Sequence, residues 1–133
     1  MMPHSISTQL TVRISDINYG GHLAHDRLVS LLHQARCDFL AHFSASEANF
    51  FGTGLIMRTL HVDYLAEAFY GDNLLITMHV TESGHTWFIL EYHVQVDDKT
   101  IATAQTKMVA FDYHKRRVAA LPKDWRHLTD KQE

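Results

Sequence analysis

Hydrophobic and polar residues first alternate along the chain and then repeat every three to four residues. Alternation over residues 9–17 places Leu10, Val12 and Ile14 on one side, which predicts a first β-strand. Over residues 22–43 the apolar positions lie three or four apart, which predicts a long helix that buries one face. The residues on that face are Leu28, Leu32, Ala35, Phe39 and Phe43.

The rest of the chain alternates and predicts four further strands within residues 55–113, at 55–65, 74–80, 87–96 and 100–113. The side chains on one face of the last of these strands are unusually small, so we expect that face to lie close against the long helix. Its residues are Ala102, Ala104, Thr106, Met108 and Ala110.

The segments that flank these strands are less regular. We expect one further helical turn within residues 44–51, closed by the glycines at 52 and 54. After Leu121 we expect a polar C-terminal tail, in which Pro122 marks the start of a short helix. The order of strand, helix and then antiparallel strands predicts an α+β class and a single domain over residues 1–133.

Composition excludes several classes of protein. Twelve Lys and Arg face fifteen Asp and Glu, without a basic stripe, so nucleic acid is not an expected partner. No apolar run approaches eighteen residues, and the N-terminus lacks a basic region followed by an apolar one, so we expect neither a membrane span nor an export signal. The single cysteine, Cys37, favours a cytoplasmic location and is expected to pack within the helix.

The segment between the first strand and the helix contains the residues best suited to catalysis. It holds Asp16, Asn18, two glycines, His22 and His25 close to the expected helix start. The first turn of a helix offers unpaired N–H groups and a partial positive charge, which stabilise an oxyanion formed from a thioester or ester carbonyl.

This order of elements resembles the hotdog fold, in which a curved antiparallel sheet wraps one long helix. The segment is similar to the signature of the 4-hydroxybenzoyl-CoA thioesterase branch, which reads carboxylate, any residue, carboxylate, two residues and glycine. Asp16 and Gly21 match the first carboxylate and the glycine. Asn18 stands where the family has its catalytic carboxylate, and an amide can neither take that proton nor form an anhydride.

The resemblance implies an acyl-CoA thioesterase in which water attacks the thioester. Asn18 would hold the water, His25 or His22 would remove its proton, and Asp16 would orient an imidazole or act as the base. Neighbouring residues are expected to bind the substrate. They are Tyr19, Gly20, Gly21, Leu23 and Asp26.

Two rival functions remain open. Asp16, Ile17 and Asn18 fit the opening of the hotdog enoyl-CoA hydratase signature, although His22 follows one residue late and no proline follows Asn18. A hotdog protein that binds acyl thioesters without catalysis is the other alternative, and the asparagine supports it. Neither a cofactor nor a metal site is expected, because the eleven histidines are dispersed and no strong zinc motif is present.

Hotdog proteins pair their sheets, so the resemblance implies a homodimer, or a dimer of dimers, with sites at the interface. A second subunit would then be able to supply the missing carboxylate from Asp63, Glu67 or Glu47. An acyl tunnel would be bounded by aromatic residues, and a basic turn would contact the phosphates of coenzyme A. These residues are Phe50, Phe51 and Tyr64 for the tunnel and Lys115, Arg116 and Arg117 for the turn, with Arg58 as a weaker candidate for the phosphates.

Overall fold

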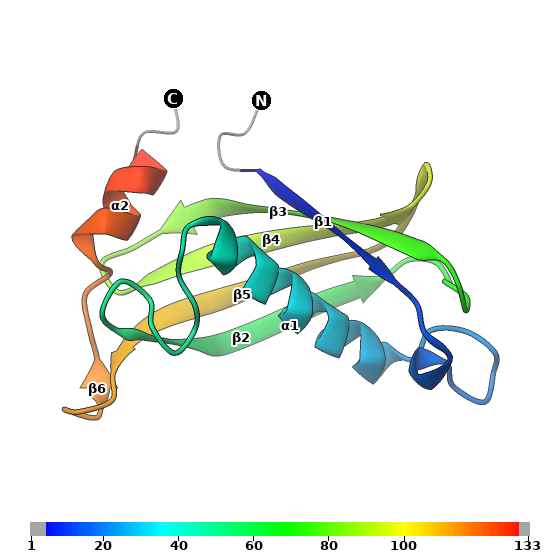
Figure 1. Ribbon diagram of the computed structural model, residues 1–133, viewed down its shortest axis with the longest axis horizontal. Coiled ribbons are helices and arrows are strands. Elements are labelled where there is room, and N and C mark those ends of the chain that lie inside the picture. The colour runs from blue at the N-terminus through cyan, green and yellow to red at the C-terminus, as the bar shows by residue number, and fades with distance from the viewer. Residues whose placement is uncertain (1–4, 131–133) are drawn as a thin grey trace.

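The five predicted strands and two predicted helices follow one another in the expected order, and the structure adds a short sixth strand that was not predicted (Figure 1). The computed structural model describes residues 5–130, with side chains through residue 128. The predictions for the first and last residues, 1–4 and 131–133, lie outside the described part. The strands are β1 (Ile6–Thr11), β2 (Gly54–Tyr64), β3 (Asn73–Ser83), β4 (Trp87–Val96), β5 (Lys99–Asp112) and β6 (Arg117–Val118), and the helices are α1 (His25–His42) and α2 (Lys123–Asp130).

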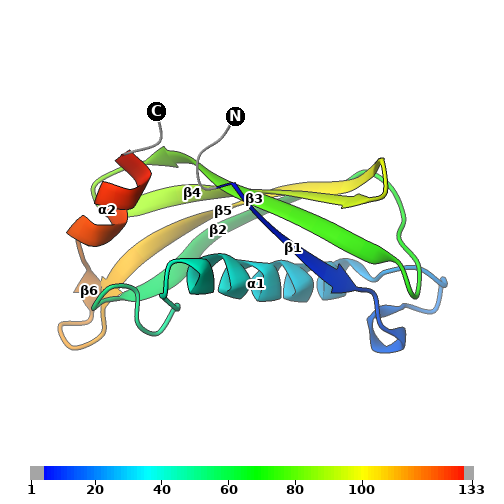
Figure 2. The same cartoon turned by 45° about the horizontal axis from the view of Figure 1, so that its top comes forward.

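The strands form one antiparallel sheet in the order β1-β3-β4-β5-β2, and β6 pairs with the end of β5. This sheet curves around α1, which lies against its concave face (Figure 2). The outer strands are β1 and β2, with 6 and 11 residues. The arrangement confirms the predicted α+β class, with one long helix against a curved sheet.

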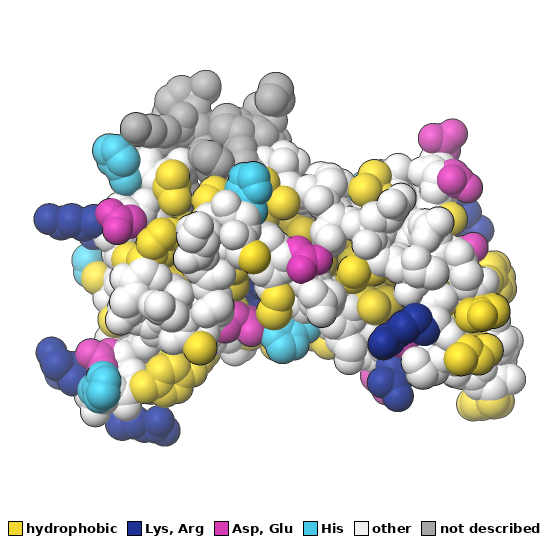
Figure 3. All heavy atoms as spheres, in the orientation of Figure 1, with side chains coloured by type: hydrophobic (Ala, Val, Ile, Leu, Met, Phe, Trp, Pro, Cys, Tyr) yellow, Lys and Arg dark blue, Asp and Glu magenta, His cyan; other side chains and the backbone are white. Residues whose placement is uncertain are grey.

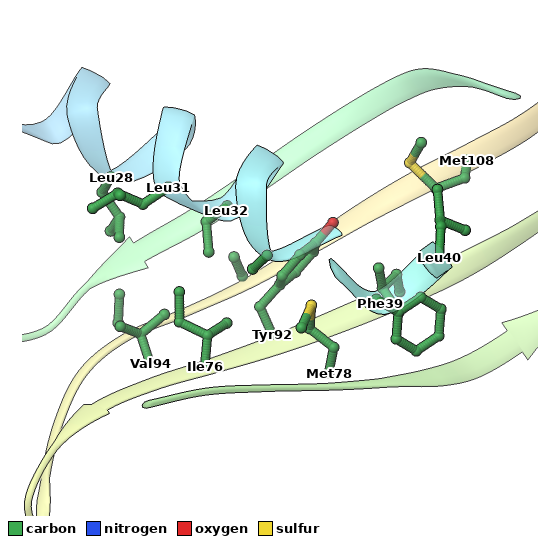
Figure 4. Packing of buried hydrophobic residues seen from close by; sticks show 14 of the residues in the cluster. Leu28, Leu31, Leu32, Phe39, Leu40, Ile76, Met78, Tyr92, Val94 and Met108 are labelled. Atoms are coloured by element: carbon green, nitrogen blue, oxygen red, sulfur yellow. The ribbon is translucent and has the colours of Figure 1, made fainter. Parts of the chain in front are cut away.

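The contact between α1 and the sheet makes up the core. Leucine and phenylalanine side chains of α1 face apolar side chains of β3, β4 and β5 (Figure 4). The small face predicted for β5 is buried, but the backbone of α1 comes closest to β1 and β3 and not to β5. Each fully buried Leu, Ile, Phe or Met contributes about 1.5–3 kcal/mol to folding. The fully buried set includes Leu28, Leu32, Phe39, Leu40, Ile76, Met78, Phe88, Leu90 and Trp125.

Helix α1 ends in a Schellman motif, which removes the expected helical turn after it. Ser44 has a φ of +61°, in the left-handed region. Its N–H donates to the carbonyl of Ala41, and the N–H of Ala45 donates to the carbonyl of Leu40. The chain therefore reverses direction, and residues 44–53 form turns and bends rather than helix.

The first strand and the helix start differ from the predicted 9–17 and 22–43. Strand β1 ends at Thr11, because the chain turns at Arg13, whose N–H donates to the carboxylate of Asp16 at 2.9 Å. Ile14 is consequently 69% exposed instead of facing the core. The helix begins three residues late because Ala24 is still extended, with its N–H bonded to the carbonyl of Asp16.

The C-terminal segment is part of the core, which corrects the prediction of a polar tail. Pro122 does precede a short helix, α2, as expected. Trp125 in that helix is fully buried and is the largest such side chain in the described residues. Its ring lies 4.8 Å from that of Phe88 and 5.1 Å from that of Phe50, measured between centroids, so α2 closes one end of the core.

A charged side chain also lies within the core. Arg36 of α1 is 6% exposed, and its guanidinium donates to the Tyr92 hydroxyl at 3.1 Å and to Glu47 at 2.8 Å. Burial on its own lowers the pKa of Arg36, but Tyr92 and Glu47 together raise the pKa above its ordinary value. Tyr92 also bonds Thr106 on β5 at 2.8 Å, so this network links α1 to the sheet. Cys37, predicted to pack, is exposed instead.

We predict that Trp125→Ala lowers the free energy of unfolding by about 3–5 kcal/mol, because a buried indole is lost and the cavity stays largely open. Lys123→Ala, an exposed change in the same helix, serves as the control and should stay within about 0.5 kcal/mol of wild type. Equilibrium urea unfolding measures both. A loss below about 1 kcal/mol for Trp125→Ala would show that α2 adds little to the core.

Candidate active site

The loop between β1 and α1 is folded by its own polar groups. The Oδ1 atom of Asn18 accepts the N–H of Gly20 at 2.8 Å, and the carbonyl of Asn18 accepts the N–H of Gly21. Gly21 has a φ of +85°, which favours glycine at that position. The N–H of Asn18 in turn donates to the carbonyl of His22 at 3.0 Å, so this turn places His22.

A cavity of about 230 Å³ lies beside this loop, at the N-terminal end of α1. Four polar side chains line it: His22 from the loop, His25 from α1, Tyr64 from the end of β2, and Glu67 just beyond β2. The remaining lining is apolar. It consists of Leu23, Leu28, Leu65, Ala66, Ala68 and Ile101.

His22 and Glu67 face each other within this cavity. The Nε2 atom of His22 lies 3.5 Å from Oε2 of Glu67. The Nδ1 atom of His22 lies 3.2 Å from the carbonyl of Leu23, which can only accept, so Nδ1 carries a proton. Nε2 is therefore the ring nitrogen that faces the carboxylate of Glu67.

His25 and Tyr64 fix each other on the opposite side of the cavity. Their rings stack with centroids 3.9 Å apart, and the Tyr64 hydroxyl donates to the backbone carbonyl of His25 at 3.0 Å. Burial, and then the charge of Asp26, raise the pKa of Tyr64 above its ordinary value. The phenol therefore stays protonated at neutral pH and keeps donating this hydrogen bond.

The first turn of α1 opens beside the same residues. Its N-cap residue is Ala24, and no side chain caps the helix. Because a helix start carries unpaired N–H groups and a partial positive charge, this end can stabilise an oxyanion that forms next to His22 and His25.

The structure brings only part of the predicted site together. His22, His25 and Leu23 line the cavity, while Asp16 lies in a separate cavity of about 430 Å³ with its carboxylate bonded to Arg13. Asn18 shapes the loop rather than lining the cavity. The other four predicted substrate-binding residues do not line it either: Tyr19, Gly20, Gly21 and Asp26.

Other predicted contacts lie at the far end of the molecule. Phe50 and Phe51 pack against Trp125, so they do not bound this cavity as an acyl tunnel, although Tyr64 does line it. The basic turn at 115–117 follows β5, whose Phe111 pairs with Gly54 at the opposite end of β2 from Tyr64. Within one chain, that turn cannot reach the cavity.

Hydrophobic side chains are exposed near the loop. Ile14 is 69% exposed and Tyr19 is fully exposed. Figure 3 shows hydrophobic side chains gathered at the end of the molecule where this loop lies. Within residues 5–128, the group of side chains that could hold a metal ion is His33, Cys37 and Glu47, away from the cavity.

Comparison with known proteins decides the family. Residues 12–128 match the model of the thioesterase-like superfamily. This chain belongs to the thioesterase-like superfamily. The match confirms the predicted hotdog family and fold, and it supports the predicted reaction class, thioester hydrolysis, over the hydratase alternative.

Individual relatives of this thioesterase-like chain carry consistent names. A 1,4-dihydroxy-2-naphthoyl-CoA hydrolase of Synechococcus elongatus is 27% identical over 128 residues, covering 91% of this chain and 94% of the relative. The acyl-CoA thioesterase YbgC of Haemophilus influenzae is 22% identical, with 93% of both chains covered. A crystal structure of a 1,4-dihydroxy-2-naphthoyl-CoA thioesterase from Synechocystis has a TM-score of 0.85 at 22% identity, covering 96% of both chains.

Sequence reasoning named Glu67, with Asp63 and Glu47, as a conceivable carboxylate donor from a partner subunit, whereas the structure has Glu67 beside His22 of the same chain. Glu67 lies in the run Leu65 to Ala68, after the last alternating residue of β2. Its position depends on the hydrogen bond from the N–H of Leu23 to the carbonyl of Ala68, which joins that run to the loop before α1. No pattern within either segment signals this contact.

We predict that Asn18→Ala destabilises this thioesterase-like protein by about 0.5–1.5 kcal/mol, because the N–H of Gly20 loses its acceptor. Asn18→Asp keeps an oxygen at the same position and should stay closer to wild type. Urea unfolding of the three proteins measures the difference. Equal stability of Asn18→Ala and wild type would contradict a role of this side chain in folding the loop.

Proposed function

We propose that this protein hydrolyses a coenzyme A thioester by attack of water in the cavity at the N-terminal end of α1. The observation that carries the proposal is the pairing of His22 with Glu67 beside an uncapped helix start. A base and a site for an oxyanion are the two elements that acyl transfer to water needs. The family supports the same reaction.

The proton path follows from the tautomer of His22. With Nδ1 bonded to the carbonyl of Leu23, Nε2 takes a proton from water as the water oxygen bonds to the thioester carbon. Glu67 stabilises the imidazolium that forms. The carbonyl electrons move onto oxygen, and the N–H groups at the start of α1 stabilise this oxyanion. When the carbonyl re-forms, the C–S bond breaks and the thiolate takes the proton back from Nε2.

Asn18 acts in this proposal as a positioning residue. Its side chain folds the turn that carries His22, which explains why an amide serves where the family has a carboxylate. His25, held against Tyr64, lines the opposite side of the acyl group and stands as the second candidate base. The proposal thus keeps both histidines of the sequence prediction and adds Glu67.

The cavity suits a compact acyl group on coenzyme A. Its lining is mostly apolar, and its volume of about 230 Å³ favours an aromatic or short acyl group over a long chain. The relatives named as hydrolases of 1,4-dihydroxy-2-naphthoyl-CoA make aromatic acyl-CoA the first substrate class to test. The proposal needs no cofactor. A reducing cytoplasm is the compartment proposed for it.

We further propose that two copies pair along β2. This strand is an outer strand of the sheet, and it carries exposed apolar side chains, with Met57 43%, Leu60 37% and Tyr64 40% exposed. An unpaired strand edge with such residues favours pairing with a second copy. Because Tyr64 also lines the cavity, a homodimer formed this way places the active site at the interface; a dimer of dimers would leave this pairing unchanged.

Two-fold pairing also gives the basic turn a role. Antiparallel copies of β2 bring the Gly54 end of one strand near the Tyr64 end of the other. Phe111 pairs with Gly54, so the turn after β5 approaches the cavity of the other copy. We therefore propose that Lys115, Arg116 and Arg117 of the partner subunit bind phosphates of coenzyme A.

We predict that the wild type releases free thiol from a panel of aryl and acyl-CoA thioesters, and that Glu67→Gln and His22→Ala each lower kcat by about a hundredfold or more. Glu82→Gln, a matched change at an exposed glutamate on β3, is the control and should keep wild-type kinetics. Release of coenzyme A thiol with a chromogenic thiol reagent measures the rates.

Unchanged kcat in both His22→Ala and Glu67→Gln would remove this pair from the mechanism. A wild type that turns over no thioester, yet binds acyl-CoA, would contradict catalysis and favour a binding protein. Hydration of a 2-enoyl-CoA by the same preparation would instead favour the hydratase.

We predict that Leu60→Lys shifts the protein from dimer to monomer, because a charge on the face of β2 opposes its burial against a second copy. Tyr70→Lys, at an exposed aromatic residue before β3, should leave the dimer intact. Light scattering after size-exclusion chromatography gives the molar masses. A wild-type monomer, or a Leu60→Lys dimer, would argue against pairing through β2.

A further inference from the structure

A second cluster of reactive side chains lies on the outer side of α1, away from the cavity. His33 and Cys37 are four residues apart, so they project from successive turns of α1 on one side. The segment after α1 folds back and brings Glu47 beside them. One donor atom from each of the three, nitrogen, sulfur and oxygen, lies within 4.8 Å of the other two. Figure 3 shows histidine and acidic side chains near one another over α1.

The carboxylate of this cluster is held in place from the core. Oε2 of Glu47 accepts from Nε of Arg36 at 2.8 Å, and Arg36 is anchored on the Tyr92 hydroxyl. The other oxygen, Oε1, faces Nε2 of His33 at 2.8 Å. Glu47 therefore presents one oxygen outward while a buried group fixes the other, which is how ligating carboxylates are commonly oriented.

We propose that His33, Cys37 and Glu47 form a binding site for a divalent transition metal ion, with Zn²⁺ as the ion that fits best. Imidazole nitrogen, thiolate sulfur and carboxylate oxygen are the three kinds of protein ligand that Zn²⁺ takes. Three protein ligands leave the fourth tetrahedral position to water, because His33 is 56% exposed and Cys37 is also exposed.

Charge and geometry both allow the ion to enter. It replaces the proton that Nε2 of His33 donates to Oε1 of Glu47, and the Cys37 thiol releases its proton to solvent. Glu47 and the thiolate then offset two of the three positive charges carried by the ion and Arg36. Bonds of about 2.0–2.3 Å to one ion need the His33 nitrogen and the Glu47 oxygen to separate slightly and the Cys37 sulfur to turn toward the ion, which the exposed His33 and Cys37 side chains allow by rotation.

The bound ion would join α1 to the segment after it. Residues 44–53 form no regular element, and Phe50 within them packs against Trp125. A metal bridge from α1 to Glu47 therefore holds this segment onto the core and raises the stability of the folded chain. This role is separate from the cavity, whose lining includes none of the three ligands.

The test uses full-length protein without a polyhistidine tag, stripped of metal with a chelator. Zn²⁺ is titrated in competition with a chromophoric chelator, and Co²⁺ is used as a spectroscopic probe. We expect one Zn²⁺ per chain, a higher unfolding temperature with Zn²⁺, and a near-ultraviolet thiolate-to-cobalt absorption band. Cys37→Ser should abolish this band, and Cys37→Ser and His33→Gln should each weaken Zn²⁺ binding about tenfold or more.

His42→Gln, a change on the same helix outside the cluster, is the matched control and should bind Zn²⁺ as the wild type does. All variants should unfold at the same temperature without metal, which separates ligand loss from misfolding. Absence of saturable binding at one Zn²⁺ per chain would overturn the proposal. Equal affinity of wild type, Cys37→Ser and His33→Gln would overturn it as well.

Discussion

The packing of α1 into the concave face of the sheet is the constraint on which the other features depend. The backbone of α1 comes closest to β1 and β3. Large apolar side chains of β3, β4 and β5 fill the space between the helix and the rest of the sheet. The position of the helix fixes both of its ends. Its N-terminal end lies beside the end of β2 and lines the cavity, while Phe39 and Phe43 near its C-terminal end contact Trp125.

In the proposed active site, the carboxylate comes from a different place in the chain than the signature segment. The signature segment lacks the second carboxylate, because Asn18 stands there and folds the turn. A carboxylate is nevertheless present, since Glu67 reaches His22 from the segment after β2. In the proposed mechanism this carboxylate acts through the imidazole of His22, beside a turn that carries an amide in place of the carboxylate.

Burying Arg36 has a desolvation free-energy cost that its hydrogen-bond partners offset. Removing a guanidinium from water is unfavourable unless its hydrogen bonds are replaced, and Tyr92 and Glu47 replace them here. Burial alone raises the pKa of Glu47, but Arg36 and His33 lower the pKa below its ordinary value, so Glu47 stays charged. The same network orients Glu47 toward His33 and Cys37. A core interaction thereby sets the geometry of a surface cluster.

Local sequence determined the helices, the strands and their buried faces, because the periods of 3.6 and 2 residues directly reflect which side chains meet the core. It identified the loop before α1 through its own turn chemistry and its resemblance to a family. Tertiary structure decided the rest. Trp125 closed the core from a segment that looked polar, and Glu67 met His22 through a contact between distant segments. Such contacts depend on the path of the chain in space, and a one-dimensional pattern records only the neighbours of each residue along the chain.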